Sequence, residues 1–201
     1  MVANALPVRG VEELVALSKR RPGGLSYGTA GVGTSPRVCG ELFRLTTGAE
    51  LTHVPYRGSA PMLTELIAGR VEVDMDNIPS SLAFIRDGKL RALATTGAAR
   101  SPVVPEVPTM DEAGVRGFEA TAWFGVLAPA ATPRPIVERL VRELDAVARD
   151  PAFHGRMAEL GAEPPRLTPE GGSSPEAFEA FLKAEREKWA EVARRSGARV
   201  D

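Results

Sequence analysis

The segment between residues 25 and 36 carries the clearest chemical signal, because a β-like run leads through a glycine-rich loop into a helix start. Its candidate ligand-binding residues are Thr29, Ala30, Gly31, Gly33, Thr34 and Ser35. The glycines permit positive φ and close backbone approach, and Ser35-Pro36 is typical of an N-cap followed by a first turn. A helix that begins there would direct free N–H groups and its positive dipole end at a carboxylate or phosphate. The alternative is a βα turn without a ligand, since the spacing is neither a Walker A motif nor a complete G-x-G-x-x-G.

A second polar group, Asp76-Asn77, follows a predicted strand. Its carboxylate and amide suit a ligand ammonium, a hydroxyl or an ordered water, and the alternative is an Asx turn before Pro79. Trp123 is a third candidate, because with Phe124 it stands in an extended apolar segment. There an aromatic ring either lines a cleft or packs in the core.

Residues suited to catalysis are few. His53 and His154 stand apart from any recognisable serine or cysteine motif, which argues against a Ser-His or Cys-His arrangement. Cys39 is expected to be a small buried hydrophobe, with an activated thiolate early in a helix as the alternative. The acids within residues 72–76 are more typical of a solvated strand face than of a metal site. We therefore expect no catalytic residue, metal or cofactor.

The hydrophobic periodicity predicts an α/β fold. Strands are expected over residues 25–28, 51–56, 71–75 and 90–96, and helices over 11–21, 35–47, 59–68 and 80–87. This alternation favours βαβ units on a parallel sheet with flanking helices, where ligands lie beyond the carboxyl ends of the strands. The loop at 29–35 and Asp76-Asn77 both follow strands, so they should share one edge of the sheet.

The last third of the chain is predicted to be mostly helical. After a proline-rich connection at 101–108, residues 118–128 form an apolar extended segment expected to be a crossing strand. Helices follow over 133–149, capped by Thr132, and from about 174 onward. The apolar side of each of these helices is expected to pack on a sheet. The helices therefore either pack on the first sheet or belong to a second lobe whose strands lie outside this chain.

Charge, hydropathy and cysteine content argue against several partners and structural features. The net charge of -1 and the scattered basic residues argue against nucleic acid as a partner. No apolar run reaches the length of a membrane span, and the first seven residues lack the basic and apolar regions of a signal peptide. The single cysteine rules out an internal disulfide.

Several motifs, taken in order, resemble one family. They are Leu25-Ser26-Tyr27, Gly31-Val32-Gly33-Thr34, Gly40-Glu41-Leu42-Phe43, His53-Val54-Pro55-Tyr56-Arg57-Gly58, Asp76-Asn77, Leu90-Arg91-Ala92-Leu93-Ala94, Pro105-Glu106-Val107-Pro108-Thr109 and Trp123-Phe124-Gly125-Val126-Leu127-Ala128-Pro129. From about residue 6 to residue 198, this succession resembles the Bug-type receptors, the periplasmic solute-binding proteins of tripartite tricarboxylate transporters.

The resemblance implies a hinged, two-lobed periplasmic binding protein that closes over a small carboxylate, such as a di- or tricarboxylate, an amino acid or an aromatic acid. Residues 1–117 would form the ligand-binding lobe of βαβ repeats, and residues 118–201 would return a crossing strand and helices to the other lobe. The loop from Thr29 to Ser35 would bind the carboxylate through backbone N–H groups, Asp76 and Asn77 would face the cleft, and Trp123 would line it. The permease subunits of the transporter would be the protein partners.

The chain also departs from the family pattern. The family's opening portion and its export signal have no counterpart, so the second lobe is expected to be incomplete and its uncovered helices prone to self-association. Arg37 stands where relatives usually have histidine and is either a cationic ligand or a surface residue, and Asp74 replaces an apolar strand residue. Two alternatives to a carboxylate receptor stay open. One is an α/β enzyme that acts on an anionic substrate through Cys39 or Asp76, and the other is a truncated receptor that binds nothing.

Overall fold

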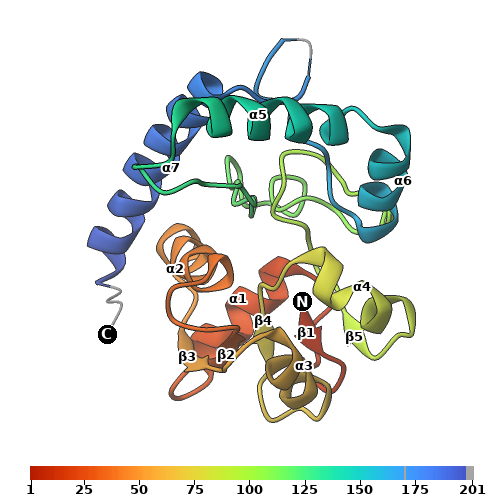
Figure 1. The fold of residues 1–201 in the computed structure, drawn as a ribbon. Coiled ribbons are helices and arrows are strands. Elements are labelled where there is room, and N and C mark those ends of the chain that lie inside the picture. The colour runs from red at the N-terminus through yellow and green to blue at the C-terminus, as the bar shows by residue number, and fades with distance from the viewer. Residues whose placement is uncertain (170, 198–201) are drawn as a thin grey trace. The chain divides into compact units, whose positions relative to one another are not determined.

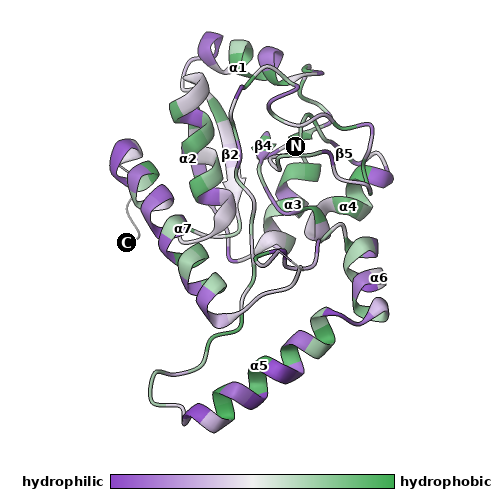
Figure 2. Cartoon of the chain, turned by 90° about the horizontal axis from the view of Figure 1, so that it is seen from above, coloured by the Kyte–Doolittle hydropathy of each residue, from purple (hydrophilic) through white to green (hydrophobic). Residues whose placement is uncertain are grey.

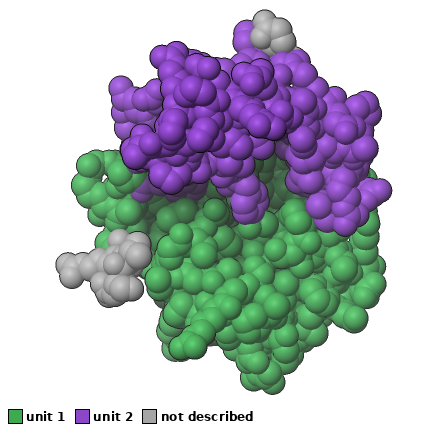
Figure 3. Space-filling view, in the orientation of Figure 1, with its two compact units in different colours: residues 1–122, 190–201 green, residues 123–189 purple. Residues whose placement is uncertain are grey.

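The computed structural model describes residues 1–169 and 171–197 (Figure 1). The chain divides into two compact units (Figure 3). Unit 1 comprises Met1–Ala122 and Ala190–Asp201, and unit 2 comprises Trp123–Trp189. All the strands named below belong to unit 1, so the sheet and the helices that cover it can be considered within that unit alone.

Unit 1 is built on a five-stranded sheet in the order β3-β2-β4-β1-β5. The strands are β1 (Val2–Ala3), β2 (Leu25–Thr29), β3 (Leu51–Pro55), β4 (Val73–Asp74) and β5 (Leu90–Arg91). The predicted α/β fold is confirmed, and β2 pairs in parallel with both β3 and β4. The sheet is mixed rather than wholly parallel, because β1 runs antiparallel between β4 and β5. A strand of two residues has no periodicity from which it could have been predicted.

The predicted helices of unit 1 are present. They are α1 (Val11–Arg20), α2 (Ser35–Thr47), α3 (Ser59–Ile67) and α4 (Ile78–Arg86). Buried apolar side chains join α3 to the sheet in a cluster made of Ala3, Met62, Leu63, Leu66, Val71 and Leu90. The close approach of α3 requires Gly28 in β2, since a Cβ there would lie 2.8 Å from Cγ of Met62. Burial of these apolar side chains stabilises the packing of α3 on the sheet.

Unit 2 is helical, as the periodicity predicted. It contains α5 (Arg134–Ala148), α6 (Pro151–Leu160) and most of α7 (Pro175–Ser196). The N-cap of α5 is Pro133 rather than the expected Thr132, and no side chain caps the helix. The sequence analysis gave no bounds for α6, which Asp150 caps by accepting a hydrogen bond from the N–H of Ala152 at 2.8 Å.

The expected crossing strand is not formed, since the structure assigns no strand to residues 118–128. The N–H of Ala120 donates to the carbonyl of Thr96 at 2.9 Å, but no ladder extends from this contact among the described residues. An extended segment becomes a strand only when a neighbouring strand supplies main-chain partners. No helix in the described part of the chain is long and apolar enough to cross a membrane.

Candidate functional site

The loop that follows β2 contains hydrogen bonds from the hydroxyls of Thr29 and Thr34 to the carbonyl of Gly31. Gly31 adopts a φ of 147°, where L side chains are strained, whereas Gly33 does not need a positive φ. Thr34 occupies the N-cap position of α2, and the expected cap residue Ser35 is instead the first helical residue. The Thr34 hydroxyl donates to the carbonyl of Gly31 at 2.7 Å and makes no capping bond to the helix. The side chain therefore shapes the loop and leaves the start of α2 uncapped.

Uncapped N–H groups are the main chemical feature of this loop. Among the described residues, the N–H groups of residues 32–35 have no hydrogen-bond acceptor. The first turn of α2 has no acidic side chain, and Gly33 and Ser35 are exposed to solvent. A helix N-terminus with free N–H groups attracts anions, because the N–H dipoles and the helix dipole both present positive charge. We call residues 29–35 the cradle.

The neighbouring strand β3 fixes the cradle in place. The N–H of Tyr56 donates to the carbonyl of Thr29 at 3.0 Å, and that of Gly58 donates to the carbonyl of Ala30 at 3.0 Å. His53 Nε2 and Thr29 Oγ1 share a hydrogen bond of 2.7 Å. Burial, aided by the charge of Arg37, lowers the pKa of His53 to about 4, so the imidazole is neutral at pH 7. The sequence analysis considered His53 only as a catalytic residue and missed this positioning contact across two parallel strands.

Asp76 and Asn77 lie at the same edge of the sheet as the cradle. In the parallel pairing of β2 with β4, Gly28 is opposite Asp74, so both strands end at the same side. Asn77 is the N-cap residue of α4, but its side chain makes no capping bond. Neither carboxylate oxygen of Asp76 has a hydrogen-bond partner among the described residues, although both are shielded from solvent. Among the described residues Asp76 and Asn77 therefore form no Asx turn, and Asp76 keeps two buried acceptor oxygens without a donor.

Asp74 adds a second buried acid at the end of β4. Its residue is 0% exposed and its two carboxylate oxygens also lack hydrogen-bond partners among the described residues. Burial raises the pKa of Asp74 to about 7; the N-terminal ammonium of Met1 opposes this shift and the carboxylate of Asp76 adds to it. The edge of the sheet after β2 and β4 therefore carries two kinds of unsatisfied group among the described residues: the buried carboxyl groups of Asp74 and Asp76, and the backbone N–H groups of residues 32–35.

Arg37 is neither a surface residue nor an arm of the cradle. Its guanidinium donates to the hydroxyl of Tyr27 at 2.7 Å and forms an ion pair with Glu41, whose side chain is 1% exposed. Arg44 completes this buried network with a bond of 2.8 Å to the other oxygen of Glu41. Since the charge of Arg37 is neutralised inside unit 1, the positive character of the cradle comes from the backbone.

The other candidates lie elsewhere. Trp123 belongs to unit 2, where its indole N–H donates to Glu185 at 3.0 Å and its ring packs against Phe178 and Phe181 of α7. Cys39 is buried in α2, as expected of a small hydrophobe. In the described residues, no group of three or more His, Cys, Asp or Glu side chains is arranged to hold a metal ion. The structure thus brings the cradle and Asp76-Asn77 to one edge of the sheet in unit 1.

Comparison with known proteins identifies the family to which this site belongs. Residues 1–192 match the family model described as the tripartite tricarboxylate transporter family receptor. The chain belongs to this receptor family. Members of the family are periplasmic solute-binding receptors and not enzymes, which removes the alternative of an enzyme acting through Cys39 or Asp76.

Curated relatives in the receptor family extend well beyond the matched region. The protein BugT of Bordetella pertussis is 36% identical over 195 residues, which make up 97% of this chain and 58% of BugT. A protein from the tcbD-tcbE intergenic region of Pseudomonas sp. strain P51 is 38% identical over 90% of this chain and 52% of its own length. The chain therefore spans about half the length of the curated relatives that it matches.

Solved receptors confirm the fold. The R. palustris protein Rpa4515, solved with adipate, is 40% identical, with a TM-score of 0.89 over 98% of this chain and 64% of its own. MatC from Rhodopseudomonas palustris, solved with bound malate, is 30% identical, with a TM-score of 0.86 over 95% of this chain and 64% of its own. Both relatives were thus solved with small dicarboxylates.

Proposed function

We propose that unit 1 binds a small carboxylate at the cradle, as part of a receptor that feeds a tripartite tricarboxylate transporter. The observation that carries this proposal is the set of N–H groups at residues 32–35, which no acceptor in the described chain satisfies. A bound carboxylate would accept from several of these groups at once and gain from the helix dipole. The adipate and malate in the solved relatives support a dicarboxylate as the ligand class.

Asp76 restricts which carboxylate fits. Its unpartnered acceptor oxygens would repel a bare anion, but they would accept a hydrogen bond from a ligand hydroxyl or ammonium, or from an ordered water. Asn77 can donate or accept beside it. We therefore place hydroxy acids such as malate, and amino acids, ahead of unsubstituted diacids. Trp123 would line the binding cleft, as the family resemblance implies.

The receptor would work in the periplasm and pass its ligand to the permease subunits of the transporter. By this proposal residues 1–117 supply one wall of the binding cleft, and residues 118–201 contribute to the lobe that supplies the other. The half-exposed cradle agrees with a single wall, since a carboxylate bound there would still meet solvent. Closure of a second wall would exclude that solvent and strengthen each hydrogen bond.

Two substitutions of Ser35 distinguish the contribution of its backbone N–H to ligand binding from that of its hydroxyl. Ser35→Pro deletes one cradle N–H, and proline is tolerated there because Ser35 is the first helical residue and Thr34 is already extended, with a ψ of 159°. Ser35→Ala removes only the hydroxyl and is the matched control. One charge-assisted hydrogen bond is worth about 1.5–3 kcal/mol, so Ser35→Pro should weaken binding by about tenfold to a hundredfold.

The test is isothermal titration calorimetry of the chain with malate, succinate and adipate. We expect malate to bind more tightly than succinate, which lacks the hydroxyl, and Ser35→Ala to bind like the unmodified chain. Equal loss of affinity in Ser35→Pro and Ser35→Ala would contradict a backbone site. If none of the three acids binds, the remaining alternative of a truncated receptor without ligand affinity is correct for this chain.

A further inference from the structure

The hydroxyl of Thr29 makes three contacts inside the cradle and its support. Its Oγ1 lies 2.7 Å from Nε2 of His53, 3.2 Å from the carbonyl oxygen of Gly31 and 3.4 Å from the nitrogen of Gly31. A threonine hydroxyl donates one hydrogen bond and accepts two. Its single hydrogen therefore goes either to His53 or to the carbonyl of Gly31, and this choice depends on the tautomer of the imidazole.

One tautomer of His53 satisfies all three contacts. When Nε2 carries the hydrogen, the imidazole donates to Oγ1 of Thr29, and the hydroxyl is free to donate to the carbonyl of Gly31. The N–H of Gly31 then donates to the second lone pair of the hydroxyl oxygen. When Nδ1 carries the hydrogen, the hydroxyl must donate to Nε2 instead, and the carbonyl of Gly31 loses its bond from Thr29. The contacts together therefore indicate the Nε2–H tautomer.

The imidazole of His53 is held in place by Tyr27. The two rings pack with their centroids 5.1 Å apart at an interplanar angle of 41°. Tyr27 is 0% exposed, and its hydroxyl accepts a hydrogen bond from Arg37 of α2 at 2.7 Å. Helix α2 lies alongside β2 and shows alternating hydrophilic and hydrophobic bands (Figure 2). Packing against a buried ring restricts rotation of the imidazole, so Nε2 stays beside Thr29.

The bond from Thr29 to Gly31 affects a donor of the cradle. The carbonyl of Gly31 and the N–H of Val32 belong to one trans peptide, so they point in opposite directions. The hydroxyls of Thr34 and Thr29 donate to this carbonyl at 2.7 and 3.2 Å, and the N–H of Val32 therefore points away from both. Since Gly31 has a φ of 147° and lacks a Cβ, the peptide can rotate with little steric resistance. The two hydroxyl bonds are what fix the direction of the N–H.

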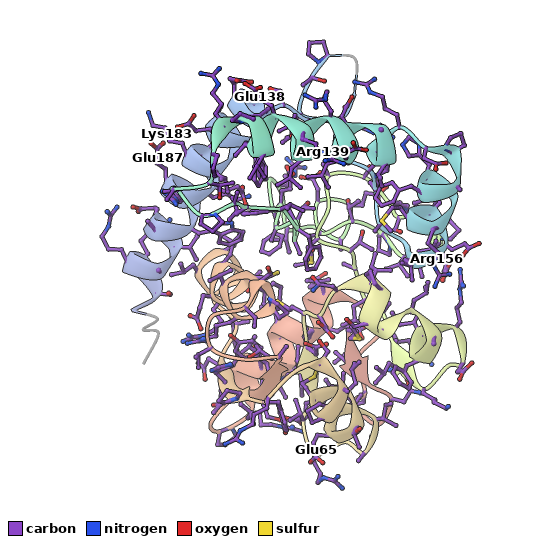
Figure 4. All side chains as sticks on the ribbon, in the orientation of Figure 1. Glu65, Glu138, Arg139, Arg156, Lys183 and Glu187 are labelled. Atoms are coloured by element: carbon purple, nitrogen blue, oxygen red, sulfur yellow. The ribbon has the colours of Figure 1, made fainter. Side chains whose placement is uncertain are left out.

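The N–H of Val32 is left for a bound anion. It has no acceptor among the described residues, and the first turn of α2 has no acidic side chain. Asp76, at the same edge of the sheet, accepts no hydrogen bond from the cradle. Of the side chains labelled in Figure 4, Glu65 is the one in unit 1; it points outward from α3 and pairs with Arg70 at 2.5 Å. A carboxylate that accepts from Val32 would also gain from the dipole of α2.

We propose that His53 is a positioning residue of the cradle: its Nε2–H, donated to Thr29, directs the Thr29 hydroxyl to the carbonyl of Gly31 and so aims the N–H of Val32 at the carboxylate. This role rests on the proposed function, because it is a role within that binding site. His53 acts through Thr29 and needs no contact with the ligand. Without the donor on His53, Thr34 alone holds the peptide, and the N–H of Val32 is fixed less well.

The tautomer of His53 can be measured in the unmodified, ligand-free chain. Imidazole ¹H–¹⁵N correlation NMR at pH 7, where the ring is neutral, distinguishes a hydrogen on Nε2 from one on Nδ1. The signals of His154 are identified by their loss in His154→Gln. We expect the hydrogen of His53 on Nε2. A hydrogen on Nδ1 would overturn the proposal, because the Thr29 hydroxyl would then donate to His53 and not to Gly31.

Variants of the contact are then compared in isothermal titration calorimetry with malate. His53→Leu removes the donor and Thr29→Val removes the hydroxyl; each should weaken binding by about threefold to tenfold, as expected for one hydrogen bond. The double variant should lose no more than either single variant. His53→Gln keeps a side-chain N–H and should recover most of the affinity lost in His53→Leu. Thr52→Val is the matched control on β3 and should bind like the unmodified chain, because its hydroxyl donates to the carbonyl of Gly23, away from the cradle.

Three calorimetric results would overturn the proposal: unchanged affinity in His53→Leu, equal losses in His53→Gln and His53→Leu, or additive losses in the double variant. The nuclear Overhauser effect between Hα of Gly31 and the amide of Val32 tests the positioning role without ligand. We expect it to change in His53→Leu and not in Thr52→Val, because rotation of the peptide changes this distance.

The ligand-free measurements separate the positioning role from the proposed function. If no acid binds the chain but the Overhauser effect changes in His53→Leu, the proposed function fails and the positioning role is retained. An unchanged Overhauser effect overturns the positioning role whether or not an acid binds. If a variant does not fold, the tautomer of His53 in the unmodified chain decides.

Discussion

Asp74 offers a test of how a buried acid affects the stability of unit 1. The residue is 0% exposed, and its carboxylate has no hydrogen-bond partner among the described residues. Burial raises its pKa from 3.8 to about 7, so the folded chain keeps this proton to much higher pH than the unfolded chain does. A carboxyl group whose folded-state pKa is raised stabilises the fold at low pH, and that contribution is lost as the pH rises through 7. Asp74→Asn should therefore remove this pH dependence.

The magnitude follows from the two pKa values. Between pH 5 and pH 8 the unfolded chain has already lost the proton, whereas the folded chain loses it within this interval. Over nearly two pH units above pH 5 the folded chain holds about one proton more than the unfolded chain, so at about 1.4 kcal/mol for each pH unit the unmodified chain should lose on the order of 2 kcal/mol of stability relative to Asp74→Asn. The substitution also removes the attraction of Asp74 for the N-terminal ammonium of Met1, whose own pKa burial lowers, so this figure is the combined effect of the pair. The two proteins should have similar stability at pH 5, and the asparagine variant should be the more stable at pH 8.

The assay is urea unfolding at several pH values from 5 to 8, followed by circular dichroism, with hydrogen exchange of the β2 amides as the measure of unit 1 alone. Asp87→Asn is the matched control, because it makes the same exchange at a side chain that is 57% exposed. The pKa of His53 is lowered to about 4, so His53 destabilises the fold as the pH falls below 6.5. Both proteins contain His53, so its effect cancels in the difference between their free energies of unfolding. A difference between Asp74→Asn and the unmodified chain that stays constant with pH would refute the reasoning.

Two further pairs of substitutions test the packing behind the cradle. Glu41→Gln should destabilise unit 1 by about 3 kcal/mol, because it leaves the charge of Arg37 without its buried partner, whereas Arg44→Gln should cost less than about 1 kcal/mol, since that side chain is 40% exposed. Urea midpoints measure both, and equal losses would show that the network is not buried as described. Gly40→Ala should cost about 1–3 kcal/mol, because its Cβ would lie 2.5 Å from Cε2 of the fully buried Tyr27. Gly33→Ala has no atom within 4 Å and should change the melting temperature by much less; similar shifts in the two alanine variants would argue against the close packing of α2 on β2.

The βαβ part of the fold was predictable from sequence because each signal is local. An apolar run, a glycine after a helix or a proline in a first turn acts within one or two turns of chain, so α2 and α3 were placed within a residue of their observed ends. The ends of β2 and β4 follow from the same signals. This is why the cradle and Asp76-Asn77 were correctly expected at one edge of the sheet.

The remaining features depend on contacts between distant parts of the chain. The strand β1 exists only because β4 and β5 pair with it, and residues 118–128 form no strand because the described chain supplies no partner. Arg37 was expected to be either a ligand arm or a surface residue, but the position of Tyr27 and Glu41 decided its contacts. The assignment of residues 118–201 to a second lobe, and the role of Trp123 in the site, remain predictions.

The position of β1 between β4 and β5 has a consequence for how unit 1 folds. Strands β2 and β3 are joined through a single helix, so their pairing requires only a short loop to close. The β1–β5 half of the sheet instead joins the first residues to residues near 90, and Arg91 donates to the carbonyl of Leu6 across 85 positions of sequence. Closing so long a loop costs entropy before any native contact compensates for it, and such non-local pairing slows folding. The half of the sheet that carries the cradle can therefore form early, while β5 and the helix before it join the sheet last.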